Sequence, residues 1–146
     1  MNVIDRFDGE NEFLSNFFTS PFEFEGIIYA TSEHAFQAAK TEDKEERKAI
    51  AALRTPGQAK RAGRKVKLRE AWNVIRVSVM RQVVRVKFTQ HPDLAKKLLA
   101  TGDAELIEGN NWNDTFWGRC RGRGENWLGK VLMELRAELA TAEKAM

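Results

Sequence analysis

The stretch that decides the fold is FEFEGIIYATSEHAFQAAK, residues 22–40. Its first eight residues alternate between apolar and polar side chains around Glu25 and Gly26, which predicts a β-hairpin that turns at these two residues. Thr31 or Ser32 then supplies an N-cap for a helix that runs to the end of the stretch. A hairpin that leads directly into a helix indicates an α+β domain, in which helices cover a small sheet.

Helix signals continue on the C-terminal side of this stretch. A second helix is expected to begin at Asp43, because Glu46 three residues later completes a capping-box pattern. Thr55 and Pro56 supply an N-cap and an N1 proline for a third helix, and Gly63 is placed to end it. These local signals predict two short helices in this part of the chain.

Residues 69–88 are rich in valine and isoleucine, which favour strands by propensity. Apolar side chains nevertheless recur from Trp72 onward at spacings of 3, 4, 4 and 3 without a turn residue, so we predict a buried helix. A short helix should follow from Pro92, and a last helix has Asn126 as its candidate N-cap. The apolar stripe of that last helix consists of Leu128, Val131, Leu132, Leu135 and Leu139.

Together these elements predict one α+β domain over residues 1–146, mostly helical around a small β-sheet. A length of 146 residues fits a single domain, and the sequence shows no internal repeat and no linker long enough to divide it. Hydrophobic residues make up 42% and charged residues 31%, which excludes collagen-like, disulfide-scaffold and low-complexity classes.

The composition also bears on location and on metals. No apolar run approaches the roughly 20 residues that cross a membrane, and the first 30 residues are acidic where a signal or transit peptide would be basic. We therefore expect a cytoplasmic protein without a membrane partner. Cys120 is the single cysteine, and with only His34 and His91 beside it the sequence indicates no metal site and no cofactor. The oligomeric state is not indicated.

Positive charge is concentrated in two basic clusters. Residues 1–40 hold two basic and seven acidic side chains, whereas Arg54 to Arg69 hold seven lysines or arginines and no acid. Arg119, Arg121 and Arg123 form the second cluster. Because a long nucleic-acid track normally comes with more than the net charge of +3, one phosphorylated molecule is the expected ligand. We expect the second cluster, Arg119 included, to bind it and the first to be a solvated helical face.

One face of the helix that follows the hairpin carries three polar side chains, those of Glu33, Gln37 and Lys40. A solvated face with one ion-pair ladder is the alternative interpretation. Glu33 lies in the first turn, where the helix dipole favours its anionic form, so it suits the stabilisation of a cation better than the donation of a proton. His34 adjoins this face, although a lone histidine is more often a hydrogen-bonded structural residue.

A second cluster of polar and aromatic residues is EGNNWNDTFWG, residues 108–118. Two tryptophans, three asparagines and Asp114 between glycines suit a loop that stacks a flat ring and hydrogen-bonds its edges. The alternative is that Trp112 and Trp117 plug an aromatic core. A glycine-rich approach to the last helix follows, a geometry that can cradle phosphate.

Four motifs in this order resemble the NADAR family, also called YbiA-like. They are residues 13–17, residues 31–40, residues 112–118, and residues 124–129 with 132–136. The resemblance covers the chain from Phe13 to about Leu139. The arginine-rich stretch 119–123 departs from the apolar and small residues expected there, which leaves the identity of the substrate open.

The resemblance implies an N-glycosidase that cleaves a ribose C1′–N bond. Members similar to this chain hydrolyse phosphorylated ribosylaminopyrimidine intermediates of riboflavin synthesis, and others remove ADP-ribose from guanine bases in nucleic acid. The expected partner is therefore a phosphorylated ribosyl small molecule or an ADP-ribosylated base, with nucleic acid among the candidates. Carried over position by position, the resemblance places at the site Asn16, Glu33, Lys40, Trp112, Asp114, Trp117 and Asn126. To these we add His34, Gln37 and Arg119 as substrate-binding candidates.

The chemistry of that reaction assigns roles to three of these residues. The transition state is oxocarbenium-like, so an ionised Glu33 would stabilise the developing charge, and Asp114 would position or deprotonate water. Lys40 would either contact phosphate or attack C1′ and form a Schiff base. Because nearby Glu33 opposes the loss of its proton unless burial outweighs the attraction, we favour the phosphate or sugar-positioning role.

A binding module that recognises ADP-ribose or a nucleic-acid phosphate without chemistry is the alternative function. Both functions predict a basic rim and a stacking pocket, so composition does not separate them. Analysis of products does, because only the enzyme releases a free base.

Overall fold

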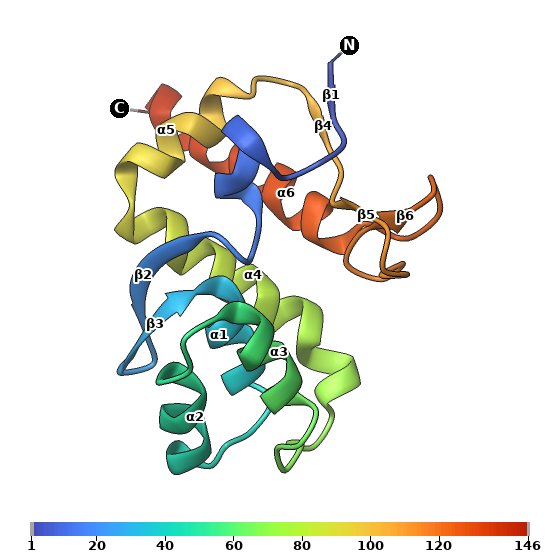
Figure 1. Cartoon of the computed structure of the whole chain (residues 1–146). Coiled ribbons are helices and arrows are strands. Elements are labelled where there is room, and N and C mark those ends of the chain that lie inside the picture. The colour runs from blue at the N-terminus through green and yellow to red at the C-terminus, as the bar shows by residue number, and fades with distance from the viewer. Residues whose placement is uncertain (1, 146) are drawn as a thin grey trace. The chain divides into compact units, whose positions relative to one another are not determined.

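The computed structural model describes residues 2–145 and divides into two compact units. The first unit consists of residues 2–15 and 91–145, and the second of residues 16–90. Figure 1 labels the elements of both units. The predicted mostly helical α+β class is confirmed, but the described residues form three two-stranded sheets rather than one small sheet.

The second unit begins with the predicted hairpin, strands β2 (Thr19–Phe24) and β3 (Ile27–Thr31), which pair antiparallel. Glu25 and Gly26 form its two-residue turn with φ angles of 50° and 85°. Both angles are positive, as the turn that matches the twist of paired strands requires. The hairpin prediction is therefore confirmed at its turn.

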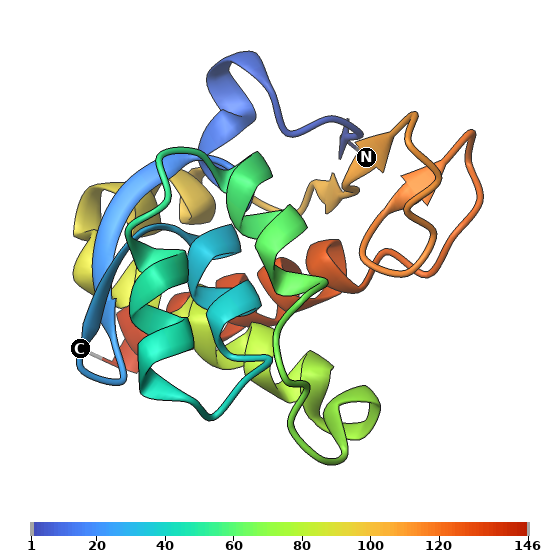
Figure 2. The ribbon, with the colours of Figure 1, turned by 60° about the horizontal axis from the view of Figure 1, so that its bottom comes forward.

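Helix α1 (Ser32–Ala38) follows the hairpin without a linker. Of the two candidate caps, Thr31 is the one used: its Oγ1 accepts a hydrogen bond from the backbone N–H of His34. Helix α1 packs against β3 and against three helices, α2 (Lys44–Ala51), α3 (Pro56–Gly63) and α4 (Trp72–Gln90). Figure 2 shows α1, α2 and α3 grouped together. This packing leaves every residue of α1 buried.

The two short helices form where their caps predict, with two differences. Asp43 caps α2 through its side chain, but Glu46 does not complete a capping box, because its carboxylate accepts from the Thr41 hydroxyl at 2.6 Å instead. Thr55 and Gln58 form the capping box, at α3. Gly63 is the last residue of α3 and does not adopt a positive φ, so it is not the left-handed glycine that ends a helix.

The valine-rich segment is the helix α4, as its length and periodicity predict. Trp72 is buried at its start, and its ring lies 5.2 Å from the ring of Phe36 on α1. Burial of one helical face outweighs the strand propensity of valine and isoleucine here, because the apolar side chains on that face pack against β2 and α1. The buried residues of α4 are Trp72, Val79, Met80, Val83, Val84, Lys87 and Phe88.

The first unit has short strands and longer helices. Strand β1 (Val3–Ile4) pairs in parallel with β4 (Glu105–Leu106), and β5 (Gly109–Asn110) pairs in parallel with β6 (Arg119–Cys120). A 3-10 helix covers Gly9–Leu14, and the two α-helices are α5 (Pro92–Ala100) and α6 (Trp127–Ala145). Helix α6 packs against α5 and β4 through its predicted apolar stripe, of which Leu139 is only half-buried. Within residues 2–145, no helix has the length and apolar character that crossing a membrane needs.

Lys87 is 1% exposed, and its amine lies 5.7 Å from the ring of Phe18 and 5.1 Å from that of Phe88. Burial lowers the pKa of Lys87 to about 7. Between that value and the ordinary 10.5 the unfolded chain holds a proton that the folded chain lacks, so stability rises with pH in this window.

The unfolding free energy of the wild type, measured relative to Lys87→Met in urea, should therefore increase by about 2 kcal/mol from pH 7 to pH 9. The comparison removes the contribution of groups common to both proteins. A difference that stays constant over these pH values would contradict the lowered pKa.

Candidate active site

The polar face of α1 is buried, which excludes the solvated ion-pair ladder as its interpretation. Glu33 is 8% exposed and Gln37 is 5% exposed. The Gln37 Nε2 donates to Glu33 Oε2 at 2.6 Å, and the backbone N–H of Glu33 donates to the carbonyl of Asn16 at 3.0 Å. Glu33 is thus held at both its backbone and its carboxylate. An oriented, buried carboxylate in the first turn of a helix is suited to stabilising a positive charge.

Gln37 is itself fixed by the neighbouring helix α3. A Cβ added to Gly63 would lie 1.9 Å from Gln37 Oε1, so only glycine fits at this position. Close packing, rather than helix termination, therefore explains Gly63. Glycine allows α3 to lie directly against the side chain that holds Glu33.

Asn16 and His34 flank Glu33 and bond to protein atoms. The Nδ2 of Asn16 lies 3.6 Å from the sulfur of Met80. The His34 ring is fully buried, with Nδ1 2.7 Å from the Thr31 hydroxyl and Nε2 2.9 Å from the carbonyl of Leu53. Because both ring nitrogens have protein partners, His34 holds the start of α1 rather than presenting a free nitrogen.

Lys40 follows the end of α1 and is half-buried. Burial lowers the pKa of Lys40 below its ordinary value; the Glu33 carboxylate opposes this shift, and the positive charges of Arg64 and Lys60 add to it. This direction is the one expected if burial outweighs the attraction of Glu33. Desolvation outweighs the attraction of the carboxylate.

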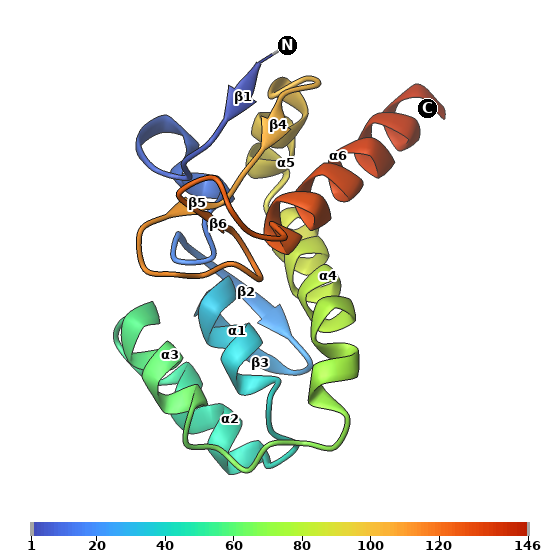
Figure 3. The ribbon, with the colours of Figure 1, turned by 90° about the vertical axis from the view of Figure 1, so that its right-hand side faces the viewer.

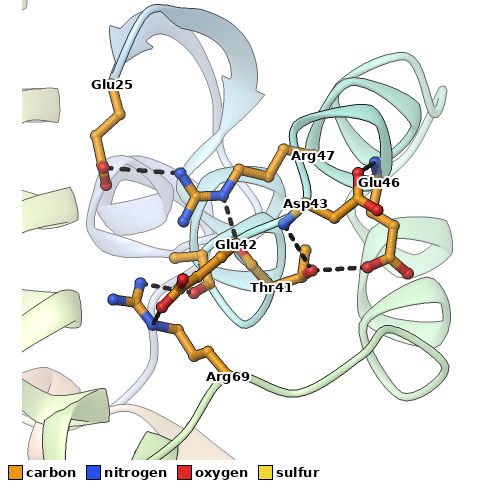
Figure 4. A network of polar contacts seen from close by, with 8 residues as sticks. Glu25, Thr41, Glu42, Asp43, Glu46, Arg47 and Arg69 are labelled. Atoms are coloured by element: carbon orange, nitrogen blue, oxygen red, sulfur yellow. Dashed lines mark hydrogen bonds and ion pairs between the residues drawn. The ribbon is translucent and has the colours of Figure 1, made fainter.

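Two arginines donate hydrogen bonds to the backbone carbonyls around Lys40, and Figure 4 shows some of these bonds. The backbone N–H of Arg69 donates to the Lys40 carbonyl at 2.8 Å, and its guanidinium donates to the Ala39 carbonyl at 3.4 Å. Arg47 Nε donates to the Thr41 carbonyl at 2.7 Å. These donors satisfy carbonyls that the end of a short helix leaves unpaired. The sequence did not indicate either arginine, because both contacts are formed by packing.

The first unit holds the loop of residues 108–118, which is ordered by two side chains. Asp114 Oδ1 accepts from the backbone N–H groups of Phe116 and Trp117 at 3.1 and 2.9 Å. Asn110 Oδ1 accepts from the N–H groups of Trp112 and Asp114, and its Nδ2 donates to the Asp114 carbonyl. Asn110 was not predicted, although an asparagine that bonds to the backbone two residues on is a known loop signal.

The two tryptophans of this loop differ in exposure. Trp112 is 57% exposed, which contradicts the core-plug alternative for this residue. Trp117 is half-buried, and its ring packs edge-to-face on Phe116 with centroids 4.8 Å apart. Trp112 is therefore the ring of the loop that a flat ligand can reach.

Arg119 and Asn126, two substrate-binding candidates, bond to the protein itself. The Arg119 guanidinium forms an ion pair with Glu105 at 3.3 Å. Asn126 is 1% exposed, accepts from the backbone N–H of Glu108 and donates to the carbonyl of Leu106, each at 2.9 Å. Asn126 occupies the predicted N-cap position, directly before α6, and its backbone carbonyl accepts from the N–H of Lys130 at 3.0 Å, but its side chain makes no cap hydrogen bond to α6. Its carboxamide instead holds the segment between β4 and β5.

The predicted site residues thus form two groups. Five lie on or next to α1 in the second unit: Asn16, Glu33, His34, Gln37 and Lys40. Five belong to the first unit: Trp112, Asp114, Trp117, Arg119 and Asn126. Among residues 2–145, histidine, cysteine, aspartate and glutamate side chains form no group of three that could hold a metal ion.

Comparison with known proteins places these residues in one family. The NADAR domain matches residues 5–140, which span both units. N-glycosidase YbiA of Escherichia coli (strain K12) is 41% identical over 143 residues, covering 96% of this chain and 88% of that protein. A riboflavin biosynthesis protein of Vibrio vulnificus (strain YJ016) is 41% identical over 135 residues, covering 90% of this chain and 36% of that protein.

A solved structure is similar over the same length. The NMR structure of the E. coli protein YbiA has a TM-score of 0.89 and 38% sequence identity, and the match covers 99% of this chain and 89% of that one. The order of motifs, the fold and the length of the match agree. The chain therefore belongs to the NADAR domain family.

Proposed function

We propose that this chain is an N-glycosidase that hydrolyses the ribose C1′–N bond of a phosphorylated ribosyl-pyrimidine of the kind formed in riboflavin synthesis. The observation that carries the proposal is the buried Glu33 carboxylate, held by Gln37 in the helix that ends beside Lys40. The names of the relatives support the reaction and the substrate class. An ADP-ribosylated base is the second candidate, because it presents the same bond.

Glu33 stabilises the charge that appears as the C1′–N bond breaks. Electron density leaves C1′ with the base, and the sugar becomes oxocarbenium-like. A carboxylate that is already oriented and dehydrated needs little reorganisation at that moment, so its effect is larger than in water. The hydrogen bond from Gln37 to Oε2 fixes the orientation of the carboxylate.

Lys40 is the nucleophile in this proposal. Its lowered pKa increases the fraction of neutral amine, and this favours a nucleophile over the phosphate contact preferred in the sequence analysis. The neutral Nζ attacks C1′, and the base leaves with the electron pair of the C1′–N bond and takes up a proton. The sugar ring then opens to a protonated Schiff base on Lys40. Water adds to this imine and releases the free sugar and the lysine.

Trp112 and Asp114 have different roles in the proposal: Trp112 stacks a base, and Asp114 holds the loop backbone and orients water. In the first unit, the exposed ring of Trp112 is available to stack a flat base, a contact of about 1–3 kcal/mol. Asp114 uses Oδ1 to hold the backbone of residues 116 and 117, so its Oδ2 is the atom that would orient water.

The Schiff base predicts that sodium borohydride, added during turnover, leaves a reduced pentose-phosphate adduct on the peptide that carries Lys40. The yield should rise with pH and reach half its maximum below pH 10.5, because the pKa of Lys40 is lowered. Mass spectrometry of the digested protein measures both.

Lys48, an exposed lysine on α2, is the matched control and should carry no adduct. Equal labelling of Lys48, or wild-type turnover by Lys40→Arg, would exclude Lys40 as the nucleophile.

A panel of ribosyl-N compounds tests the function. The panel contains phosphorylated ribosylaminopyrimidines, nucleotides and an ADP-ribosylated guanine base, and mass spectrometry detects released bases. The proposal expects release from the phosphorylated ribosylaminopyrimidines. Binding of ADP-ribose without release of a base from any compound would favour the binding module instead.

A further inference from the structure

We propose that Lys60 and Arg64 of α3 form the subsite for the substrate's phosphate group, beside Glu33 and Lys40. This inference rests on the proposed function, in which the substrate is a phosphorylated ribosyl compound. It assigns to α3 the contact that the sequence had assigned to the Arg119 to Arg123 stretch.

Helix α3 lies directly against the polar face of α1. Figure 3 shows the two helices next to each other in the second unit. Gly63 touches the side chain of Gln37, which in turn donates to Glu33. Ala59, one turn before Gly63, is also buried, so Ala59 and Gly63 define the contact face of α3.

The basic side chains of α3 point in different directions around the helix. Arg64 keeps helical dihedral angles, with φ −75° and ψ −15°, so the helical path includes it. At about 100° per residue, Lys60 and Arg64 lie about 40° apart as i and i+4 neighbours, Lys60 about 80° and Arg64 about 120° from the middle of the contact face. Arg61 lies on the opposite side of the helix. Lys60 is half-buried, whereas Arg64 and Arg61 are both exposed.

Two positive charges and one negative charge act on Lys40. Arg64 and Lys60 are close enough to Lys40 for their charges to lower its pKa, and the carboxylate that acts on Lys40 is that of Glu33. Within residues 2–145, no ion pair joins Lys60 or Arg64 to a carboxylate. A dianionic phosphate would neutralise this excess of cations through charge-assisted hydrogen bonds.

Other basic residues have different partners. Arg69 is paired with Glu42 and Arg119 with Glu105. Phosphate binding by α3 also leaves Lys40 free for C1′, because the two roles that the sequence offered for Lys40 no longer compete. A phosphate held by α3 would place C1′ against the face of α1 that Glu33, in its first turn, and Lys40, after its last turn, share.

Titrations with ribose 5-phosphate and with ribose, followed by calorimetry or NMR, test the subsite. Lys60→Gln and Arg64→Gln should each weaken ribose 5-phosphate binding by at least ~10-fold, a typical loss for a charge-assisted hydrogen bond. Neither should change the affinity for ribose. Arg61→Gln, which removes the same charge from the far side of α3, is the matched control and should stay within about 2-fold of the wild type.

Unchanged ribose 5-phosphate affinity in both variants, or no saturable binding by the wild type, would overturn the subsite. The KM for a cleaved phosphorylated substrate separates this failure from that of the proposed function. If both variants turn over substrate with an unaltered KM, the N-glycosidase function is supported and the phosphate subsite is excluded. If the wild type cleaves no substrate but the two variants lose ribose 5-phosphate binding, the subsite is supported and the N-glycosidase function is excluded.

A salt series distinguishes one phosphate from a polymer. Ribose 5-phosphate affinity should depend weakly on salt. Binding of a single-stranded oligonucleotide with a log–log slope beyond about −3 would mean roughly four or more phosphate contacts, which contradicts a subsite for one phosphate.

Discussion

Glu33→Gln should lower kcat by at least ~100-fold, a typical effect of losing one preorganised electrostatic stabiliser. The fold should be retained, because glutamine has the same shape and its side-chain oxygen can still accept the hydrogen bond from Gln37. The substitution removes the negative charge and leaves the contacts around it. Affinity for the substrate should change little, because the charge on C1′ develops only in the transition state.

Steady-state kinetics with circular dichroism checks this prediction. Glu45→Gln is the control, since Glu45 is an exposed carboxylate on α2 in a surface pair with Lys48, and it should leave kcat unchanged. Near-wild-type turnover by Glu33→Gln would remove Glu33 from the mechanism.

Trp72→Ala should lower the free energy of unfolding by roughly 3–5 kcal/mol, as truncation of a large core side chain does. Trp72 is 6% exposed and packs on Phe36 of α1, so alanine leaves a cavity between α4 and the helix that carries Glu33. Trp112→Ala should cost less than about 1 kcal/mol, because that ring is 57% exposed.

Urea denaturation of the two variants compares these costs directly. Trp112→Ala should raise KM or slow the reaction instead, as expected of a ring that stacks the base. If Trp112→Ala is the more destabilised protein, the assignment of Trp112 to a stacking loop is wrong.

Much of the fold is predictable from the sequence where a local rule decides it. The turn at Glu25 and Gly26, the cap at Thr31 and the proline at the start of α3 each act within four residues. Helix α4 is not predictable from a local rule, because the propensity of valine favours a strand. Only the periodicity of its apolar residues over the whole segment indicates a helix.

The paired strands of the first unit lie beyond such rules. All four strands there, β1, β4, β5 and β6, have two residues each. Two residues show no alternation pattern, and their pairing depends on contacts distant in the chain. The sequence therefore predicted one sheet where the described residues form three two-stranded sheets.

The candidate site was predictable in its residues but not in their partners. Glu33, Gln37 and Lys40 share a helical face, and this follows from spacing alone. Three other features depend on how the chain packs. The polar face of α1 is buried, and the side chains of His34 and Asn126 form their hydrogen bonds with other protein atoms. Lys60 and Arg64 are close enough to Lys40 for their charges to lower its pKa. The basic run is mostly exposed, as expected of a solvated face, and packing of α3 on α1 leaves Lys60 half-buried; we propose that Lys60 and Arg64 of this run bind phosphate.

Product stoichiometry tests the central claim most directly. A phosphorylated ribosylaminopyrimidine is incubated with the protein, and NMR follows its anomeric C1′ proton together with the free base. The account predicts that the N-glycoside signal disappears while pentose phosphate and free base appear in equal amounts, and that Glu33→Gln slows all three changes alike. A substrate that saturates the protein while its anomeric signal persists would contradict the account.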